Sequence, residues 1–316
     1  MTVAGTAGER WRPESIPTRE LDDVALMAEG LLFPEGPVAF ADGSVLLTEI
    51  DRGTLTRVSV DGSVEVVATC GGGPNGAAVG PDGWVYVCNN GGRWASGNWK
   101  GGWIEKVDPG NGTVEVVYRE CDGRRLSGPN DIVFDSSGNL WFTDTGKFQG
   151  RIRDVGSVYY ATADGKRISE VAHPAESPNG IGLSPEGHTL YYAETVTGRL
   201  RRRAIIGPGE LEAVHGHGAE TLVCGLPGLQ PFDSLAVDAG GNICVATFVT
   251  GCITVISADG AEVTQYTLPP AFHDAMPTNL CFGGPDLTTA YITLAGTGRL
   301  ISCSWPAPGL KLAYNA

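Results

Sequence analysis

The stretch LSGPNDIVFDSSGNLWFTDTG, residues 126–146, decides the fold. A polar segment at 128–131 precedes a short apolar run at 132–134. A turn-forming cluster at 135–138 and a second apolar run at 140–143 follow. Apolar runs of this length, bounded by Gly, Asn, Asp and Ser, are typical of strands and are too short for a stable helix. The stretch therefore predicts two antiparallel strands joined by a turn, with polar side chains at one end.

The same pattern occurs six times, and a proline marks the start of each repeat: Pro34, Pro74, Pro129, Pro178, Pro231 and Pro277. The spacing between successive prolines, with four short strands in each repeat, predicts an all-β fold. The expected fold is a six-bladed β-propeller with four-stranded antiparallel blades. The sixth repeat ends after three strands, whereas residues 23–28 form an apolar run without a nearby partner. Pairing the two would close the ring and remove two exposed strand edges.

Composition sets the broad class of the protein. The chain has 316 residues, of which 42% are hydrophobic and 18% charged. We expect an N-terminal arm at 1–20 and one propeller domain at 21–316. The net charge of −14 disfavours nucleic acid as a partner, and no long apolar span indicates contact with a membrane. Eight cysteines without a CxxC pair, several of them inside strand runs, predict buried thiols and a cytoplasmic location.

Polar residues stand at the same position of every repeat: Glu35, Asn75, Asn130, Asn179, Asp233 and Asn279. The first strand of each propeller blade lines the axis, so these side chains should converge at one mouth of the channel. Singly, each could be a turn-capping residue. As a set they favour a site for a hard divalent cation, because carboxylate and amide oxygens are the ligands that Ca²⁺ and Mg²⁺ prefer. No histidine occupies this position, which makes a dedicated zinc site less favoured.

Two further groups belong to the same face. The second strands end on Glu49, Asn89, Asp144, Glu194 and Thr247. These residues could support the site or contact substrate, or they could simply be strand-end hydrogen bonders. The insert GGRWASGNWKGGW at 91–103, with Arg93 and Trp94, could cover the mouth as a lid or substrate wall. The alternative is a solvated loop with a tryptophan anchored on the neighbouring blade.

Several motifs, taken in order, resemble the SMP-30/gluconolactonase/luciferin-regenerating-enzyme family: FPEGPVAF at 33–40, SGPNDIVFDSSGNLWFTD at 127–144, SPNGIGLSPEGHTLYYAET at 177–195 and FDSLAVDAGGNICVAT at 232–247. Members are six-bladed propellers with one catalytic divalent metal. The resemblance implies that Glu35, Asn179 and Asp233 are metal ligands and that Asp233 activates water. It also implies that Asn130 is a ligand or a substrate contact, and that Asp144 lies near the substrate.

The implied activity is metal-dependent hydrolysis of a small-molecule lactone or ester. The expected ion is calcium, with magnesium, manganese or zinc as alternatives. The expected substrate contacts are Asn75, Asn130, Asp144, Arg93, Trp94 and Asn279. Members that bind sugar lactones often carry an arginine just before the third-blade asparagine, whereas Leu126, Ser127 and Gly128 precede Pro129 here. Either Arg124 or Arg125 takes that role, or the substrate is less polar. Hydrolysis of a phosphotriester, or a non-catalytic calcium-binding or ligand-binding propeller, are the alternatives.

Overall fold

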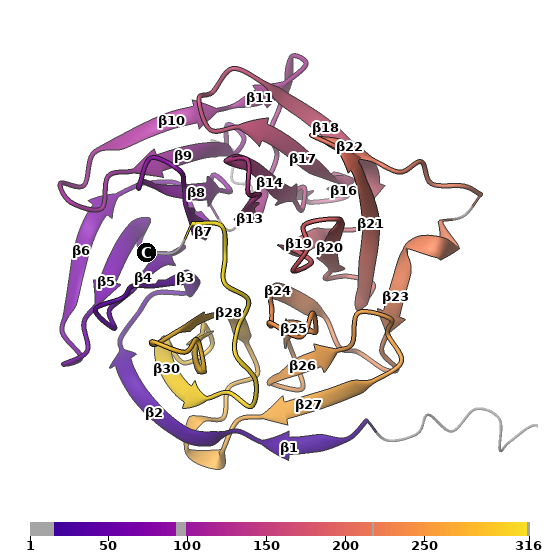
Figure 1. Cartoon of the computed structure of the whole chain (residues 1–316). Coiled ribbons are helices and arrows are strands. Elements are labelled where there is room, and N and C mark those ends of the chain that lie inside the picture. The colour runs from indigo at the N-terminus through magenta and orange to yellow at the C-terminus, as the bar shows by residue number, and fades with distance from the viewer. Residues whose placement is uncertain (1–15, 93–98, 217, 315–316) are drawn as a thin grey trace, which may run out of the picture.

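The computed structural model describes residues 16–92, 99–216 and 218–314. Six antiparallel sheets surround a central axis as the blades of a propeller (Figure 1), which confirms the predicted fold. In the first three blades, the strands run from the axis outward as follows: β3 (Pro34–Ala39), β4 (Val45–Glu49), β5 (Thr54–Val58) and β6 (Val64–Thr69); β7 (Pro74–Val79), β8 (Val85–Asn89), β9 (Trp103–Val107) and β10 (Val114–Tyr118); β13 (Pro129–Phe134), β14 (Asn139–Asp144), β17 (Gly156–Thr162) and β18 (Ile168–Ala175).

The remaining blades follow the same order, with additions at their outer edges. Their strands are β19 (Pro178–Leu183), β20 (Thr189–Glu194), β21 (Arg199–Gly207), β22 (Glu210–Leu211) and β23 (Leu222–Gly225); β24 (Phe232–Val237), β25 (Ile243–Thr247), β26 (Cys252–Ile256) and β27 (Val263–Thr267); β28 (Pro277–Gly283), β29 (Thr289–Leu294) and β30 (Arg299–Ser304). Two small hairpins are separate from the blades: β11 (Glu120–Cys121) with β12 (Arg124–Arg125), and β15 (Phe148–Gln149) with β16 (Ile152–Arg153).

The turn of the opening stretch follows from its residue types. Asp135 accepts hydrogen bonds through Oδ1 from the backbone N–H groups of Ser137, at 2.9 Å, and Asn139, at 3.0 Å. Gly138 takes the left-handed conformation (φ 80°), which glycine adopts without strain. The turn thus returns β14 antiparallel to β13, with Phe142 opposite Ile132.

The ring is closed by an N-terminal strand, as predicted. β2 (Asp22–Glu29) pairs antiparallel with β30 and places Leu26 opposite Ile301. β1 (Thr18–Glu20) adds in parallel to β27 of the fifth blade. The expected arm at 1–20 therefore differs from the structure at its C-terminal end, because Thr18–Glu20 belong to a sheet; residues 1–15 lie outside the described part of the chain.

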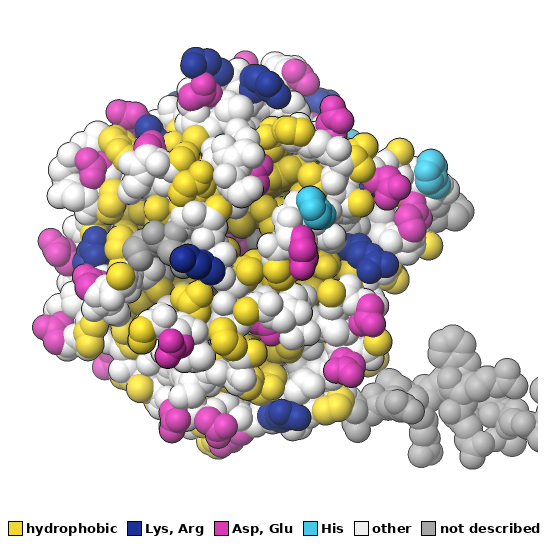
Figure 2. Space-filling model, in the orientation of Figure 1, with side chains coloured by type: hydrophobic (Ala, Val, Ile, Leu, Met, Phe, Trp, Pro, Cys, Tyr) yellow, Lys and Arg dark blue, Asp and Glu magenta, His cyan; other side chains and the backbone are white. Residues whose placement is uncertain are grey.

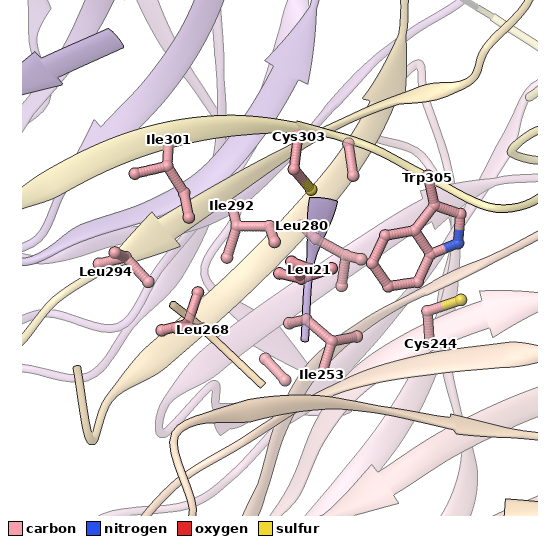
Figure 3. Close-up of a cluster of buried hydrophobic side chains, with 12 residues drawn as sticks. Leu21, Cys244, Ile253, Leu268, Leu280, Ile292, Leu294, Ile301, Cys303 and Trp305 are labelled. Atoms are coloured by element: carbon pink, nitrogen blue, oxygen red, sulfur yellow. The ribbon is translucent and has the colours of Figure 1, made fainter. Parts of the chain in front are cut away.

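Hydrophobic layers between neighbouring blades hold the ring together. The layer between the fifth and sixth blades includes Cys244, Ile253, Leu280, Ile292 and Trp305, all buried (Figure 3). They come from β25, β26, β28, β29 and the segment after β30, so each sheet contributes one face to this layer. All eight cysteines are free thiols, and most are buried, in agreement with the sequence.

The central channel has one polar and one apolar part. Its apolar part is a cavity of about 880 Å³, lined by inner-strand residues such as Val38, Ile132 and Leu235, and it reaches Asp131 and Asn279 at the polar end. The C-terminal segment crosses the other end (Figures 1 and 2). The backbone N–H of Leu310 donates to the Val237 carbonyl at 3.0 Å, and Figure 2 shows many hydrophobic side chains at the surface on this face of the propeller.

Helices are minor elements of the described ranges. They are the two 3₁₀ turns η1 (Ala219–Thr221) and η2 (Pro270–Phe272). In this part of the chain, neither helix has the length or the apolar character needed to cross a bilayer.

Candidate functional site

The six polar residues predicted to converge lie at the start of the six inner strands, and all are buried: Glu35, Asn75, Asn130, Asn179, Asp233 and Asn279. Adjacent inner strands contact one another around the whole ring. In every blade the pairing register between the first and second strands shifts within the first residues of the inner strand, as between Pro129 and Ile132. Such irregularities re-aim side chains next to functional sites, so the shift accounts for polar residues at the strand starts.

Glycines let neighbouring inner strands approach closely at this level. A Cβ on Gly36 would lie 2.3 Å from the carbonyl oxygen of Asn75, and one on Gly180 would lie 2.5 Å from the backbone nitrogen of Leu235. Such contacts are too short for any other residue. The crowding brings the residues before these glycines, Glu35 and Asn179, close to their neighbours in the ring.

Asp131 also lies at the candidate site, although it is not among the residues predicted from the repeat. It occupies the position that is glycine in the first, second and fourth blades, and its Oδ1 lies 2.5 Å from the point where a Cβ on Gly76 would stand. The Gly76 backbone therefore leaves room for this carboxylate. The signal was present in the sequence, because PND replaces the PNG of the second and fourth repeats.

Three carboxyl groups interact at the polar end of the channel. Burial, with the Asp131 charge second, raises the pKa of Glu35 to about 8. Burial likewise raises the pKa of Asp131 to about 7. The pKa of Asp233 is raised well above its ordinary value by burial and by the Glu35 charge. Each shift means that burial at this end of the channel disfavours the charged form of the carboxyl group.

The amide side chains complete the ring. Asn179 donates through Nδ2 to Oδ1 of Asp233, and its own Oδ1 accepts from the Ser234 hydroxyl at 3.4 Å. The side-chain oxygens of Asn75 and Asn130 are buried without a hydrogen-bond partner. Orphaned buried oxygens are rare because leaving one unpaired costs about 1–3 kcal/mol.

This donor set fits a hard dication. Oxygen ligands dominate, and carboxylates are combined with amide oxygens that nothing else satisfies. Among the residues that the structure describes, no three His, Cys, Asp or Glu side chains converge closely enough to chelate an ion by themselves. The amides are therefore needed to complete the coordination.

The residues that end the second strands bind the backbone of their own blades. Asp144 accepts hydrogen bonds from the N–H groups of Ser127 at 2.7 Å, Gly128 at 2.6 Å and Gly146 at 2.9 Å. Glu49 accepts from Leu32 and Asn89 from Gly73, each in the loop before its own inner strand. These side chains fix the loops that lead into the six polar residues at the inner-strand starts, which together form the polar ring. A substrate contact by Asp144 remains a prediction.

The insert of the second blade is partly outside the described residues, including Arg93 and Trp94. The described end places the indole N–H of Trp99 at 3.4 Å from the Asn90 carbonyl. Lys147, on the third blade, donates to the Gly92 carbonyl at 2.6 Å and to Oδ1 of Asn90 at 3.3 Å. Burial lowers the pKa of Lys147 to about 8, and the Asp144 charge opposes that shift. Lys147, which sequence reasoning did not single out, thus links the second and third blades.

Without divalent cations, we expect the melting temperature to fall as the pH rises from about 5 to about 8. Glu35 ordinarily titrates near 4.5 but titrates near 8 in the fold. Between these values the folded chain retains a proton that the unfolded chain has lost, so stability decreases as pH rises. Asp131 acts in the same direction.

Thermal unfolding monitored by circular dichroism across this pH range, with chelator and with added calcium, measures the effect. Calcium should remove most of the slope by compensating the carboxylates. A chelated protein whose melting temperature rises steadily up to pH 8 would contradict the predicted charge repulsion.

Comparisons with known proteins agree with this fold. The sequence model described as the SMP-30/Gluconolactonase/LRE-like region matches residues 33–296. The lactonase drp35 of Staphylococcus saprophyticus is 28% identical over 255 residues, which cover 80% of this chain and 73% of the relative. The drp35 of Staphylococcus epidermidis is 27% identical over 292 residues, covering 91% and 81%.

Solved structures show the same fold at lower identity. A gluconolactonase from Xanthomonas campestris superposes with a TM-score of 0.72 at 22% identity, covering 90% of this chain and 89% of that structure. The calcium-binding protein regucalcin from Agrobacterium tumefaciens gives a TM-score of 0.71 at 19% identity, covering 95% and 100%.

Proposed function

The chain belongs to the SMP-30/gluconolactonase/LRE-like family, and from this premise we propose that it is a divalent-metal-dependent lactonase. The proposal rests on the six polar residues that lie together at one end of the channel. Buried carboxyl groups meet amide oxygens without partners at one end of the channel. The drp35 relatives are lactonases, which supports the reaction class.

Glu35, Asn130, Asn179 and Asp233 would hold the cation, and calcium suits their oxygen donors best. A bound cation polarises a lactone carbonyl and stabilises negative charge on its oxygen. Asn75 and Asn279 complete the ring beside these residues, where they would contact the substrate. The Asn279 side chain opposes the rise in the Glu35 pKa, so its amide favours the charged form of that carboxylate.

Asp233 acts as the general base. The hydrogen bond from Asn179 to Oδ1 fixes the orientation of its carboxylate. It takes a proton from the attacking water as the new C–O bond forms at the lactone carbonyl. The ring C–O bond then breaks, and Asp233 returns the proton to the alkoxide, which leaves a hydroxy acid.

A pH-indicator screen of the purified full chain tests the proposal. The protein is stripped with chelator, reloaded with calcium, magnesium, manganese or zinc, and offered sugar, aliphatic and aromatic lactones. Acid release that requires the cation supports the proposal. Fluoride release from a fluorophosphate without lactone turnover would favour a phosphotriesterase, and tight calcium binding without any turnover would favour a binding protein.

A further inference from the structure

We propose that a hairpin on the third blade makes the enzyme select lactones that carry an alkyl or aryl chain, an inference that rests on the proposed function. The hairpin spans residues 145–155, between β14 and β17, and contains β15 and β16. Its side chains Phe148 and Ile152 are 58% and 67% exposed. Large apolar side chains that are exposed to solvent can bind an apolar part of a ligand.

The base of the hairpin is bonded to the loop that leads into the polar ring. The backbone N–H of Thr145 donates to the Gly128 carbonyl at 3.0 Å. The Ser127 hydroxyl donates to Oδ2 of Asp154 at 2.7 Å. Gly128 stands two residues before Asn130, so the hairpin lies on the same face of the propeller as the candidate site.

Side chains of the hairpin also reach the blades on both sides. Lys147 donates to the Gly92 carbonyl on the second blade at 2.6 Å. Arg153 donates to the Ser177 hydroxyl and forms an ion pair with Glu176 at 3.2 Å, just before the fourth inner strand. The hairpin is therefore fixed across three blades. Fixed apolar side chains bind without a large ordering cost.

Recognition of a sugar lactone needs polar groups that are free to bind hydroxyls, because buried hydroxyls without partners are costly. Two of the arginines on this side are already engaged. Arg124 pairs with Glu170 at 3.2 Å, and Arg125 donates to the Lys100 carbonyl at 3.3 Å. Arg151 lies in the exposed turn of the hairpin, where water solvates it. What the hairpin offers a substrate is the apolar surface of Phe148 and Ile152.

The apolar character continues around this face. Val196 follows the second strand of the fourth blade, and Leu229 and Val249 flank the inner and second strands of the fifth; all three are exposed. Single exposed apolar residues are common. Here they stand on loops around one channel mouth, next to a site that takes a small molecule. A substrate chain that extends from the reacting carbonyl would cover them.

The test is a series of δ-lactones whose alkyl substituent grows from none to several carbons. We expect kcat/KM of the calcium-loaded protein to rise about twofold for each added CH₂, half of the full burial effect on a logarithmic scale. In the double variant Phe148→Ser, Ile152→Ser the rise should flatten, while the unsubstituted lactone is hydrolysed at the wild-type rate. Val60→Ser, which changes a 69% exposed valine in the β5–β6 loop on the opposite face, should keep the wild-type slope.

The other possible results contradict either the inference about substrate chain length or the proposed lactonase function. Turnover of short lactones without dependence on chain length, or a preference for polyhydroxylated lactones, overturns the inference alone. An unchanged slope in the double variant also overturns the inference. So does sedimentation of the wild type as a dimer and of the double variant as a monomer. Absence of turnover on every lactone overturns the proposed function and this inference with it.

Discussion

Replacing Asp233 with Asn should reduce lactone turnover by about 10³-fold, within the range for loss of a general base, while the propeller stays folded. Asparagine matches the shape of aspartate but cannot accept a proton from water. The side chain is buried at the polar ring and bonded to Asn179, so no solvent-exposed group can replace it. kcat measured at saturating calcium isolates this chemical effect from weaker cation binding.

Asp259→Asn is the matched control, because it makes the same change at an exposed turn of the same blade. It should leave kcat unchanged. Calcium titration followed by calorimetry shows whether the Asp233 variant is loaded. Full turnover in the loaded variant would remove Asp233 from the mechanism and direct attention to Asp131 as the base.

The second large effect concerns Glu35→Gln. We expect calcium affinity to fall by about 100-fold or more, because the variant lacks one charged oxygen ligand of a hard cation. The metal-free variant should nevertheless melt at a higher temperature than the metal-free wild type near pH 8. Glu35 is partly ionised there, its charge is unfavourable beside Asp131 and Asp233, and glutamine removes it.

Differential scanning calorimetry with chelator and with calcium measures both parts. Glu65→Gln, an exposed change on β6, should behave as wild type. A Glu35 variant that is less stable without metal and binds calcium normally would show that Glu35 supports the fold and is not a ligand. We thus expect Glu35 to increase calcium affinity and to decrease the stability of the metal-free fold, so that stability is lost where function is gained.

The repeat explains why much of the fold was predictable. The proline-marked pattern specified six blades, and the unpaired run at 23–28 specified how the ring closes, as β2 and β30 confirm. Both inferences depend on local sequence plus one rule of sheet pairing. The burial of Glu35, Asn130, Asn179 and Asp233 at one level follows from the same repeat.

The features that could not be predicted from the sequence depend on contacts between blades. Asp131 reads as an ordinary loop acid until the Gly76 backbone shows the space that it fills. Lys147 is one of five lysines, and nothing distinguishes it until the fold brings Asn90 within 3.3 Å of it. The roles of the second-strand ends, such as Asp144, were open because a carboxylate at a strand end suits a substrate as well as three backbone N–H groups.

The pairing of β2 with β30 has a consequence for biosynthesis. Leu26 and its partner Ile301 are 275 residues apart in the chain (301 − 26), so a ribosome must finish nearly the whole protein before the last sheet can form. Until then β2 has a free edge while the other five blades assemble beside it. Pairings this distant form slowly and leave unfinished edges open to other chains. Yield on overexpression should therefore depend on the supply of chaperones during synthesis more than on the stability of the finished ring.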